Sequence, residues 1–174
     1  VSMYIAMNTA YFNLNQSTET FYEEHNFADY YFHVVRAPEI IVRQIEAVPG
    51  VTQATGRIQT DVPLLKADDQ RATARLSGYP FPLERQINRY FLMSGRAFEK
   101  DPHGGQIEVI LDPQFAAANR LAVNDTVTIV AEGKPVPLTV VGSAISPEFV
   151  YTMQDAASLL PEPELFGIFM LPQN

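Results

Sequence analysis

FADYYFHVVRAPEIIVRQIEAVPGVTQATGRIQT, residues 27–60, is the stretch that decides the fold. Aromatic and β-branched residues crowd Phe27–Val35, and such residues favour a half-buried strand. Pro38 suits the first turn of a helix, where a missing backbone N–H costs nothing. Apolar residues then recur at helical spacing, at Ile41, Ile45 and Val48. Pro49-Gly50 ends this helix, and a second extended run leads to Thr60, so the stretch predicts strand, short helix, strand.

The rest of the chain predicts further helices and strands on both sides of this unit. We expect an N-terminal helix over Met3–Glu24, broken around Asn13–Ser17, and a short Ala-rich helix over Pro113–Leu121 capped by Asp112. A short helix or turn is expected over Asp155–Leu160. Alternating or apolar runs predict strands at Arg71–Tyr79, Tyr90–Met93, Ile107–Leu111, Thr126–Val130, Pro137–Val141 and Leu165–Leu171. This pattern predicts an α+β fold in two subdomains, with a boundary near residues 100–106.

Composition excludes several classes of function. The 174 residues carry a formal net charge of −8, and the basic residues are scattered, so we expect no nucleic-acid partner. The chain has no cysteine, which removes disulfides, thiolate nucleophiles and Cys-based zinc sites. No apolar run approaches 18 residues, as a membrane-spanning helix requires. The sequence begins without an initiator methionine, and we expect it to be cut from a longer protein.

Residue patterns typical of catalysis or metal binding are weak. The histidines His25, His33 and His103 lack the spacing of metal ligands. Asp101 and His103, beside two glycines, could orient a base, but the same residues suit any tight loop. Three carboxylate groupings could act as glycosidase pairs or lie in solvated surface: Glu23-Glu24, Asp68-Asp69, and Glu162 with Glu164. We therefore expect no catalytic residue, no cofactor-binding residue and no metal site.

Aromatic residues before the short helix are the strongest non-catalytic signal. Alternation along a strand places Tyr31 and His33 on one face, and Tyr30 and Phe32 on the other. One face is expected to pack on the helix over residues 38–48, and the other to meet a partner or another subdomain. Core packing is the alternative, because aromatic residues dominate both settings. The candidate partner interface is thus Tyr30, Tyr31, Phe32 and His33.

Short motifs along nearly the whole chain resemble the MacB-like periplasmic core domain of FtsX/MacB/LolC-type ABC transporter permeases. Their order and spacing carry the resemblance more than any single motif. They are Phe21-Tyr22-Glu23, Phe27-Ala28-Asp29, Arg36-Ala37-Pro38, Val48-Pro49-Gly50-Val51, Ser94-Gly95-Arg96-Ala97-Phe98, Ile107–Leu111 with Ala116–Leu121, Val123-Asn124-Asp125-Thr126-Val127, Leu138–Gly142 and Ser146-Pro147-Glu148-Phe149-Val150-Tyr151. Asn124 departs from the glycine of many relatives.

The resemblance implies the domain organisation. Residues 1–26 would be a helix continuing from a transmembrane helix, and 27–105 a βαβ-rich porter-like subdomain. Residues 106–174 would be a small mixed β subdomain with a short helix and a return strand. A further helix and strand would be expected after Asn174, so the sheet of the porter-like part is expected to be incomplete, and either to lack a strand or to be completed by a neighbour.

The resemblance also implies the function. The chain would be the extracytoplasmic, non-catalytic domain of a permease subunit in the inner (cytoplasmic) membrane, on its periplasmic or extracellular side. It would couple cytoplasmic ATP hydrolysis to export, lipoprotein release or another periplasmic event. The implied partners are a cytoplasmic ATPase subunit, a second permease subunit or homodimer, and a periplasmic protein. Two alternatives remain open: a secreted hydrolase using Asp101 and His103, and a solute-binding module with an aromatic cleft at Tyr30–Phe32.

Overall fold

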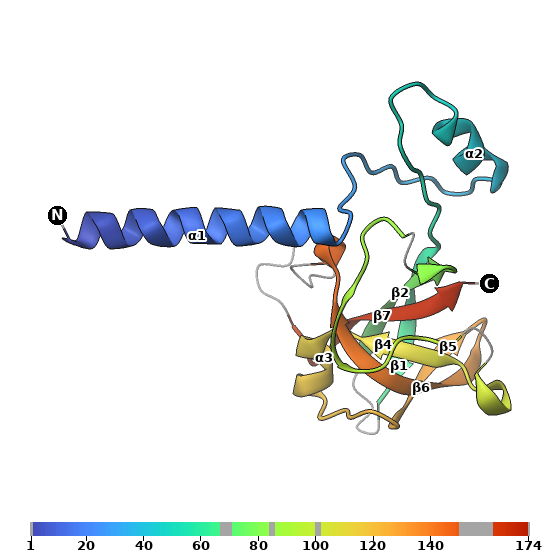
Figure 1. Cartoon of the computed structure of the whole chain (residues 1–174). Helices are drawn as coiled ribbons and strands as arrows, with labels where there is room; N and C mark the ends of the chain where they lie inside the picture. The colour runs from blue at the N-terminus through green and yellow to red at the C-terminus, as the bar shows by residue number, and fades with distance from the viewer. Residues whose placement is uncertain (1, 67–70, 84–85, 100–101, 150–161, 174) are drawn as a thin grey trace.

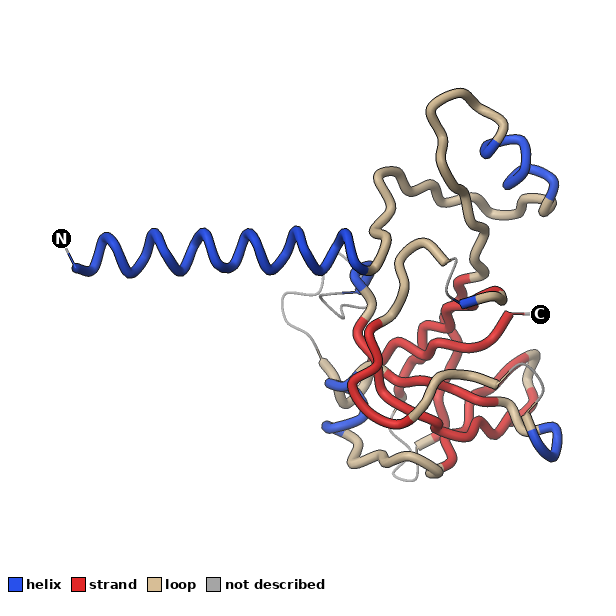
Figure 2. Tube along the Cα trace, in the orientation of Figure 1, coloured by secondary structure: helices blue, strands red, loops and turns tan. Residues whose placement is uncertain are grey.

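The chain folds into three parts that follow one another in sequence (Figure 1). A computed structural model describes residues 2–66, 71–83, 86–99, 102–149 and 162–173. Helix α1 (Ser2–Glu24) leads away from the rest of the molecule as one rod, without the break predicted around Asn13–Ser17. Residues 27–58, here called the lobe, contain α2 (Ile40–Glu46) and otherwise loops, as Figure 2 shows. The described residues from Gln59 onward form the body.

The body is built on one mixed sheet. Its strands among the described residues are β1 (Gln59–Leu65), β2 (Ala72–Pro80), β3 (Phe91–Gly95), β4 (Glu108–Leu111), β5 (Thr126–Ala131), β6 (Lys134–Ile145) and β7 (Phe166–Gln173). They pair in the order β3-β6-β4-β7-β2-β1-β5, and β5 also pairs with β6. This extra pairing closes six strands into a ring, with β3 on the outer edge of β6. Strands β2 and β7 are parallel, as are β4 and β6, and the other pairs are antiparallel.

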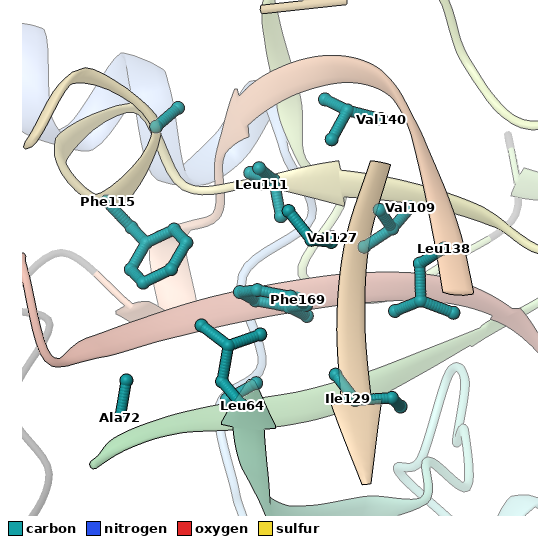
Figure 3. Packing of buried hydrophobic residues seen from close by; sticks show 12 residues of the cluster. Leu64, Ala72, Val109, Leu111, Phe115, Val127, Ile129, Leu138, Val140 and Phe169 are labelled. Carbon is teal, nitrogen blue, oxygen red and sulfur yellow. The ribbon is translucent and has the colours of Figure 1, made fainter. Parts of the chain in front are cut away.

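Apolar side chains fill the inside of this ring (Figure 3). The cluster includes Phe169 of β7 and Phe115 of α3 (Pro113–Ala118), both 0% exposed, with ring centroids 5.2 Å apart. Figure 3 shows its aliphatic members arriving from β1, β4, β5 and β6: Leu64, Val109, Leu111, Val127, Ile129, Leu138 and Val140. Because side chains of six strands and a helix converge there, the body has its own hydrophobic core.

A second apolar cluster covers the other face of β7 and β4. Successive strand residues point to opposite faces, so Ile168 and Met170 flank Phe169 but face outward with Ile110. Tyr79 of β2 joins them and is 1% exposed. Both faces of β4 and of most of β7 are therefore covered, which explains the apolar runs Val109–Leu111 and Phe166–Leu171.

Asp112 joins α3 to the sheet. As predicted, it caps the helix: its Oδ1 accepts hydrogen bonds from the backbone N–H of Gln114 at 3.0 Å and Phe115 at 2.9 Å. Its Oδ2 accepts another from the N–H of Ile168 in β7 at 2.9 Å. Burial raises the pKa of this carboxyl, while the three N–H donors act in the opposite direction. A glycine is required at position 167, next to Ile168, because an added Cβ would lie 2.4 Å from Cγ of Phe115.

Most of the predicted elements are confirmed with small shifts in their ends. These are the N-terminal helix, the helix within residues 38–48, the capped helix after Asp112, and the strands that the structure shows as β2, β3, β4, β5, β6 and β7. The α+β class is confirmed as well. The predicted short helix at Asp155–Leu160 lies outside the described residues. The predicted boundary near residues 100–106 falls between β3 and β4, and both of these strands pair with β6; the division into subdomains stays a prediction.

The prediction of a strand over Phe27–Val35 is wrong. These residues are extended but form no strand, and the second run becomes a strand only from Gln59. A strand needs a neighbour to satisfy its backbone N–H and C=O groups. In the parts of the chain described, no strand lies against residues 29–35, so their β-forming composition finds no partner.

Candidate functional site: the junction of lobe, helix α1 and body

The aromatic segment at the start of the lobe presents two different faces. Tyr30 and Phe32 are 83% and 77% exposed. Tyr31 and His33 instead line a cavity, with their rings edge to face at 4.7 Å, and the Tyr31 hydroxyl donates to Oε1 of Gln59 at 3.2 Å. All four predicted interface residues are exposed, Tyr31 to 53%, but only Tyr31 and His33 are turned toward the body.

The cavity lies between the lobe and the sheet and has a volume of about 580 Å³. Its lining comes from the lobe (Phe27, Ala28, Tyr31, His33), from three strands of the body (Gln59, Arg75, Ile168) and from the loops next to them (Asn88, Glu148, Phe149). Pockets for small molecules commonly measure about 300–1,000 Å³ and often lie where two parts of a protein meet. The volume of this cavity lies within that range, and its position between lobe and sheet is a usual one for such pockets.

Glu148, which lines the cavity, forms a buried ion pair with Arg57. Nη1 of Arg57 lies 2.9 Å from Oε2 of Glu148, and the two side chains are 8% and 10% exposed. Arg57 also lies over the ring of Tyr79, 4.1 Å from its centroid, and its Nη2 donates to the carbonyls of Ile87 and Asn88. Its Nε has no hydrogen-bond partner within the described structure. The guanidinium therefore reaches three other segments of the chain.

The Glu148 carboxylate accepts from two more side chains. Gln59 Nε2 donates to Oε1 at 2.6 Å, and Asn88 Nδ2 lies 3.5 Å from Oε2. Glu148 stands on the 3₁₀ turn η3 (Pro147–Phe149), directly after β6, and its backbone N–H donates to Oγ of Ser146 at 3.4 Å. A carboxylate with several charge-assisted hydrogen bonds holds its neighbours in a defined geometry.

The two tyrosines of the junction are held as neutral phenols. Burial, together with the negative charge of Glu148, raises the pKa of Tyr31 to about 12. Burial also raises the pKa of Tyr79, whose hydroxyl donates to Oγ of Ser146 at 3.3 Å. Neither hydroxyl is therefore suited to proton abstraction at neutral pH.

Helix α1 ends at the same junction. The backbone N–H of Asn88 donates to the carbonyl of Asn26, and that of Arg89 to the carbonyl of His25, both at 2.8 Å. The Arg89 side chain donates to the carbonyl of Glu24. The His25 ring lies edge-on to Phe91 of β3 at 5.7 Å. These contacts attach the last turn of α1 to the loop before β3.

Away from this end, α1 exposes large apolar side chains. Tyr4, Met7, Tyr11 and Leu14 are 60–75% exposed, and they recur at alternating spacings of three and four residues. That spacing places them on one stripe of the helix, as along a coiled-coil seam. No helix among the described residues is long and apolar enough to cross a membrane.

The structure describes some of the residues considered for catalysis or metal binding. No group of three or more His, Asp or Glu side chains that could hold a metal ion occurs in the described ranges. Nδ1 of His25 lies 2.8 Å from the carbonyl of Phe21, and His33 packs on Tyr31. Asp101 of the hydrolase alternative lies outside the described residues, and His103 belongs to the 3₁₀ turn η2 (His103–Gly105).

Sequence reasoning placed Tyr31 and His33 among the candidates but did not single out Arg57, Asn88 or Glu148. Arg57 and Glu148 are 91 residues apart in the sequence. Each looks locally like an ordinary surface residue, and their burial depends on how the sheet brings β1 and the turn after β6 together. A local pattern cannot show a pairing of this kind.

Comparisons with known proteins give a remote likeness among solved structures. No family model and no curated protein match the sequence. Among solved structures, the chain is similar to the periplasmic region of MacB from Actinobacillus actinomycetemcomitans, with 14% sequence identity and a TM-score of 0.46. The match covers 80% of this chain and 56% of that one, so the chain spans little more than half of that structure's length.

Proposed function

We propose that this chain is the extracytoplasmic domain of an ABC transporter permease subunit and that it acts by contact, without catalysis. It couples ATP hydrolysis in the cytoplasm to export, lipoprotein release or another event outside the membrane. The family assignment rests on the ordered motifs of the sequence, from Phe21-Tyr22-Glu23 to Ser146-Pro147-Glu148.

One structural observation carries the contact role. Helix α1 and the lobe expose large apolar side chains, and both meet the well-packed body at one buried polar junction. Exposed apolar surface of this kind marks sites of protein or membrane contact. A body with its own core and two uncovered extensions is an arrangement suited to passing movement from one partner to another.

The lobe belongs, on this proposal, to a porter-like subdomain over residues 27–105, and residues 106–174 form the mixed β subdomain. The extended segment 29–35 has strand-forming residues and no strand beside it in the described structure. A strand supplied by another segment or subunit would satisfy its backbone groups and cover Tyr30 and Phe32. Helix α1 would continue from a transmembrane helix.

The proposed setting is the inner membrane, with this domain on the periplasmic or extracellular side. The partners are a cytoplasmic ATPase subunit, a second permease subunit or a second copy, and a periplasmic protein. The net charge of −8 supports the absence of nucleic acid from this set. No cofactor is required for the proposed role.

The natural polypeptide, expressed with its own flanking sequence, tests the proposal. We expect it in the membrane fraction, with the lobe open to protease added from outside, and we expect a vanadate-sensitive ATPase to copurify in mild detergent. A photo-crosslinker placed at Tyr30 should then capture a partner in intact cells. The same crosslinker at Thr126, an exposed residue of β5, serves as the control.

Two results would reject the proposal. One is a natural polypeptide that is not membrane-associated after washing at high salt. The other is a membrane-associated polypeptide that copurifies with no ATPase under conditions that preserve ABC complexes. Capture at Thr126 equal to that at Tyr30 would reject the lobe as the partner surface while leaving the family assignment standing.

The cavity favours a second candidate, a solute-binding module. Three aromatic rings line it, those of Phe27, Tyr31 and Phe149, and its charged groups Arg75 and Glu148 are each paired, with Asp61 and Arg57. Such a lining suits a neutral aromatic solute. A thermal-shift screen of neutral aromatic compounds, repeated with Tyr31→Ala, distinguishes this candidate, because bound ligand raises the melting temperature of wild type alone.

A further inference from the structure

We propose that the Glu148 carboxylate is the joint at which both ends of the lobe, and through them helix α1, are fastened to the body. Neutralising this carboxylate would free the lobe and α1 to turn relative to the sheet. The existence of the joint depends on the geometry alone. Its use in coupling movement rests on the function proposed above.

The first end of the lobe reaches Glu148 through Asn88. The Asn88 side chain accepts from the backbone N–H of Ala28 at 2.9 Å through Oδ1, and its Nδ2 lies 3.5 Å from Oε2 of Glu148. The backbone of Asn88 pairs with Asn26, next to the end of α1. One side chain thus links the start of the lobe to the carboxylate.

The second end of the lobe reaches the same carboxylate directly. Arg57 is the last residue but one of the lobe, and Gln59 begins β1. Arg57 pairs with Oε2 of Glu148 at 2.9 Å, and Gln59 donates to Oε1 at 2.6 Å. Both oxygens of one carboxylate therefore hold the two points where the chain enters and leaves the lobe.

Other contacts that hold these parts to the body are hydrogen bonds and one ring contact near the two ends of the lobe. They join Asn26 and Thr55 to Gln86, Ile58 to Gly78 and Gln173, and the last turn of α1 to Arg89 and Phe91. Neither α1 nor α2 packs extensively against any helix or strand in the described structure. Figure 1 shows the lobe joined to the body by its two connecting segments. Removing one partner of a buried ion pair leaves an uncompensated charge and is strongly destabilising to the local arrangement. The joint is consequently sensitive to a single change of charge.

A neighbouring ion pair supplies a matched control. Arg75 and Asp61 face each other across β2 and β1, with Nε–Oδ1 and Nη2–Oδ2 distances of 2.8 Å. Their side chains are 26% and 38% exposed, and Asp61 lies four residues beyond Arg57. Asp61→Asn removes an acidic partner from the β1–β2 ladder without changing a residue at either end of the lobe.

Distances between spin labels test the joint in this chain itself. The protein has no cysteine, so single cysteines label cleanly. The label pairs are Val35→Cys with Thr126→Cys, for lobe and body, and Asn15→Cys with Thr126→Cys, for α1 and body. All three positions are exposed. In Glu148→Gln we expect each distance distribution to broaden about twofold, because further orientations become populated. Wild type and Asp61→Asn should share the same narrow distributions.

Unchanged distributions in a folded Glu148→Gln protein would overturn the proposal, as would equal broadening in Asp61→Asn. If Glu148→Gln does not fold, the double variant Arg57→Met/Glu148→Leu replaces it, since removing both charges avoids an unpaired one. That variant lacks the hydrogen bonds to Gln59 and Asn88 and should also give broad distributions; narrow ones would reject the joint. None of these outcomes depends on an ATPase, so the proposed function is tested separately.

Discussion

Similar aromatic residues are buried in the body and exposed in the lobe. In the body, Phe169 and Phe115 are wholly buried inside a closed ring of strands, and each is surrounded by side chains from several elements. In the lobe, Phe32 and Tyr30 are more than three-quarters exposed, although the sequence around them is as strand-like as that of β7. The difference teaches that a β-forming sequence becomes a strand only where a neighbouring strand is available.

The same contrast separates the two parts physically. Burial of apolar area is the main favourable term in folding, and the body has it within its own residues. The lobe and α1 depend instead on polar contacts near the two ends of the lobe, among them those of Glu148 and Arg89. Parts held by few buried apolar contacts have low local stability, which is the usual property of elements that move or bind.

The largest expected effect comes from truncating one phenylalanine in each region. Phe169→Ala should lower the free energy of unfolding by about 3–5 kcal/mol, because it leaves a cavity in the core. Phe32→Ala should change it by less than about 0.5 kcal/mol, as surface substitutions usually do. Urea unfolding followed by circular dichroism measures both. A loss above about 2 kcal/mol in Phe32→Ala would mean that the lobe packs in solution as a core does.

A smaller effect is expected from the helix caps. Asp112→Ala removes the N-cap of α3 and the acceptor for Ile168, and it should cost about 2 kcal/mol. Glu39, at the start of α2 in the lobe, makes no side-chain capping hydrogen bond, so Glu39→Ala should leave the melting temperature unchanged. Calorimetry on the two variants checks this pair. Equal losses would contradict the view that the lobe contributes little to global stability.

The sequence predicted the body better than the junction, for a physical reason. Several elements of the body carry local signals in the sequence. Asp112-Pro113 is a helix cap, β5 and β6 are joined by a turn, and β7 is a largely apolar run. The alternation that separates Tyr30 from Tyr31 was also readable. The ion pair of Arg57 and Glu148 was not, because it depends on contacts between residues far apart in sequence. The missing strand over residues 29–35 was not foreseen, because strand propensity says nothing about whether a partner is present.

The contributions of two buried carboxyls of the body, Asp112 and Glu108, to folding stability should change with pH in opposite directions. Burial raises the pKa of Asp112, so the folded state holds its proton more tightly and its contribution to stability falls as pH rises through that raised pKa. Burial also acts to raise the pKa of Glu108, but the Arg96 guanidinium and the Glu99 N–H lower it overall. The contribution of Glu108 is therefore present above its unfolded-state pKa of about 4.3 and lost as pH falls through the lowered value.

The free energy of unfolding, measured as a function of pH for wild type and for the matched amide variants, gives the slope that each carboxyl contributes. The advantage of wild type over Asp112→Asn should shrink as pH rises from below about 4, the unfolded-state pKa of an Asp. The advantage of wild type over Glu108→Gln should grow as pH rises over the acid range. The phenol of Tyr31 in the folded wild type stays neutral until a pH of about 12. The difference in stability between wild type and Tyr31→Phe should therefore not change with pH over the acid range. Slopes of the same sign for Asp112 and Glu108 would contradict the assignment of their environments.

The smallest effect is expected in α1. The double variant Met7→Ser/Leu14→Ser changes two side chains that are 66% and 68% exposed, so the free energy of unfolding of the body should not move beyond about 0.5 kcal/mol. Met7 and Leu14 belong to the apolar stripe of α1 and are available for contact with a partner. In the natural polypeptide the variant should therefore weaken binding of any partner that contacts this stripe. Asn8→Ser and Asn15→Ser, polar changes on the same helix, are the control for helix content. If the double variant lowered the melting temperature of the isolated chain by several degrees while the control did not, α1 would fold back on the body in solution. The division into a self-sufficient body and dependent extensions would then hold for the lobe alone.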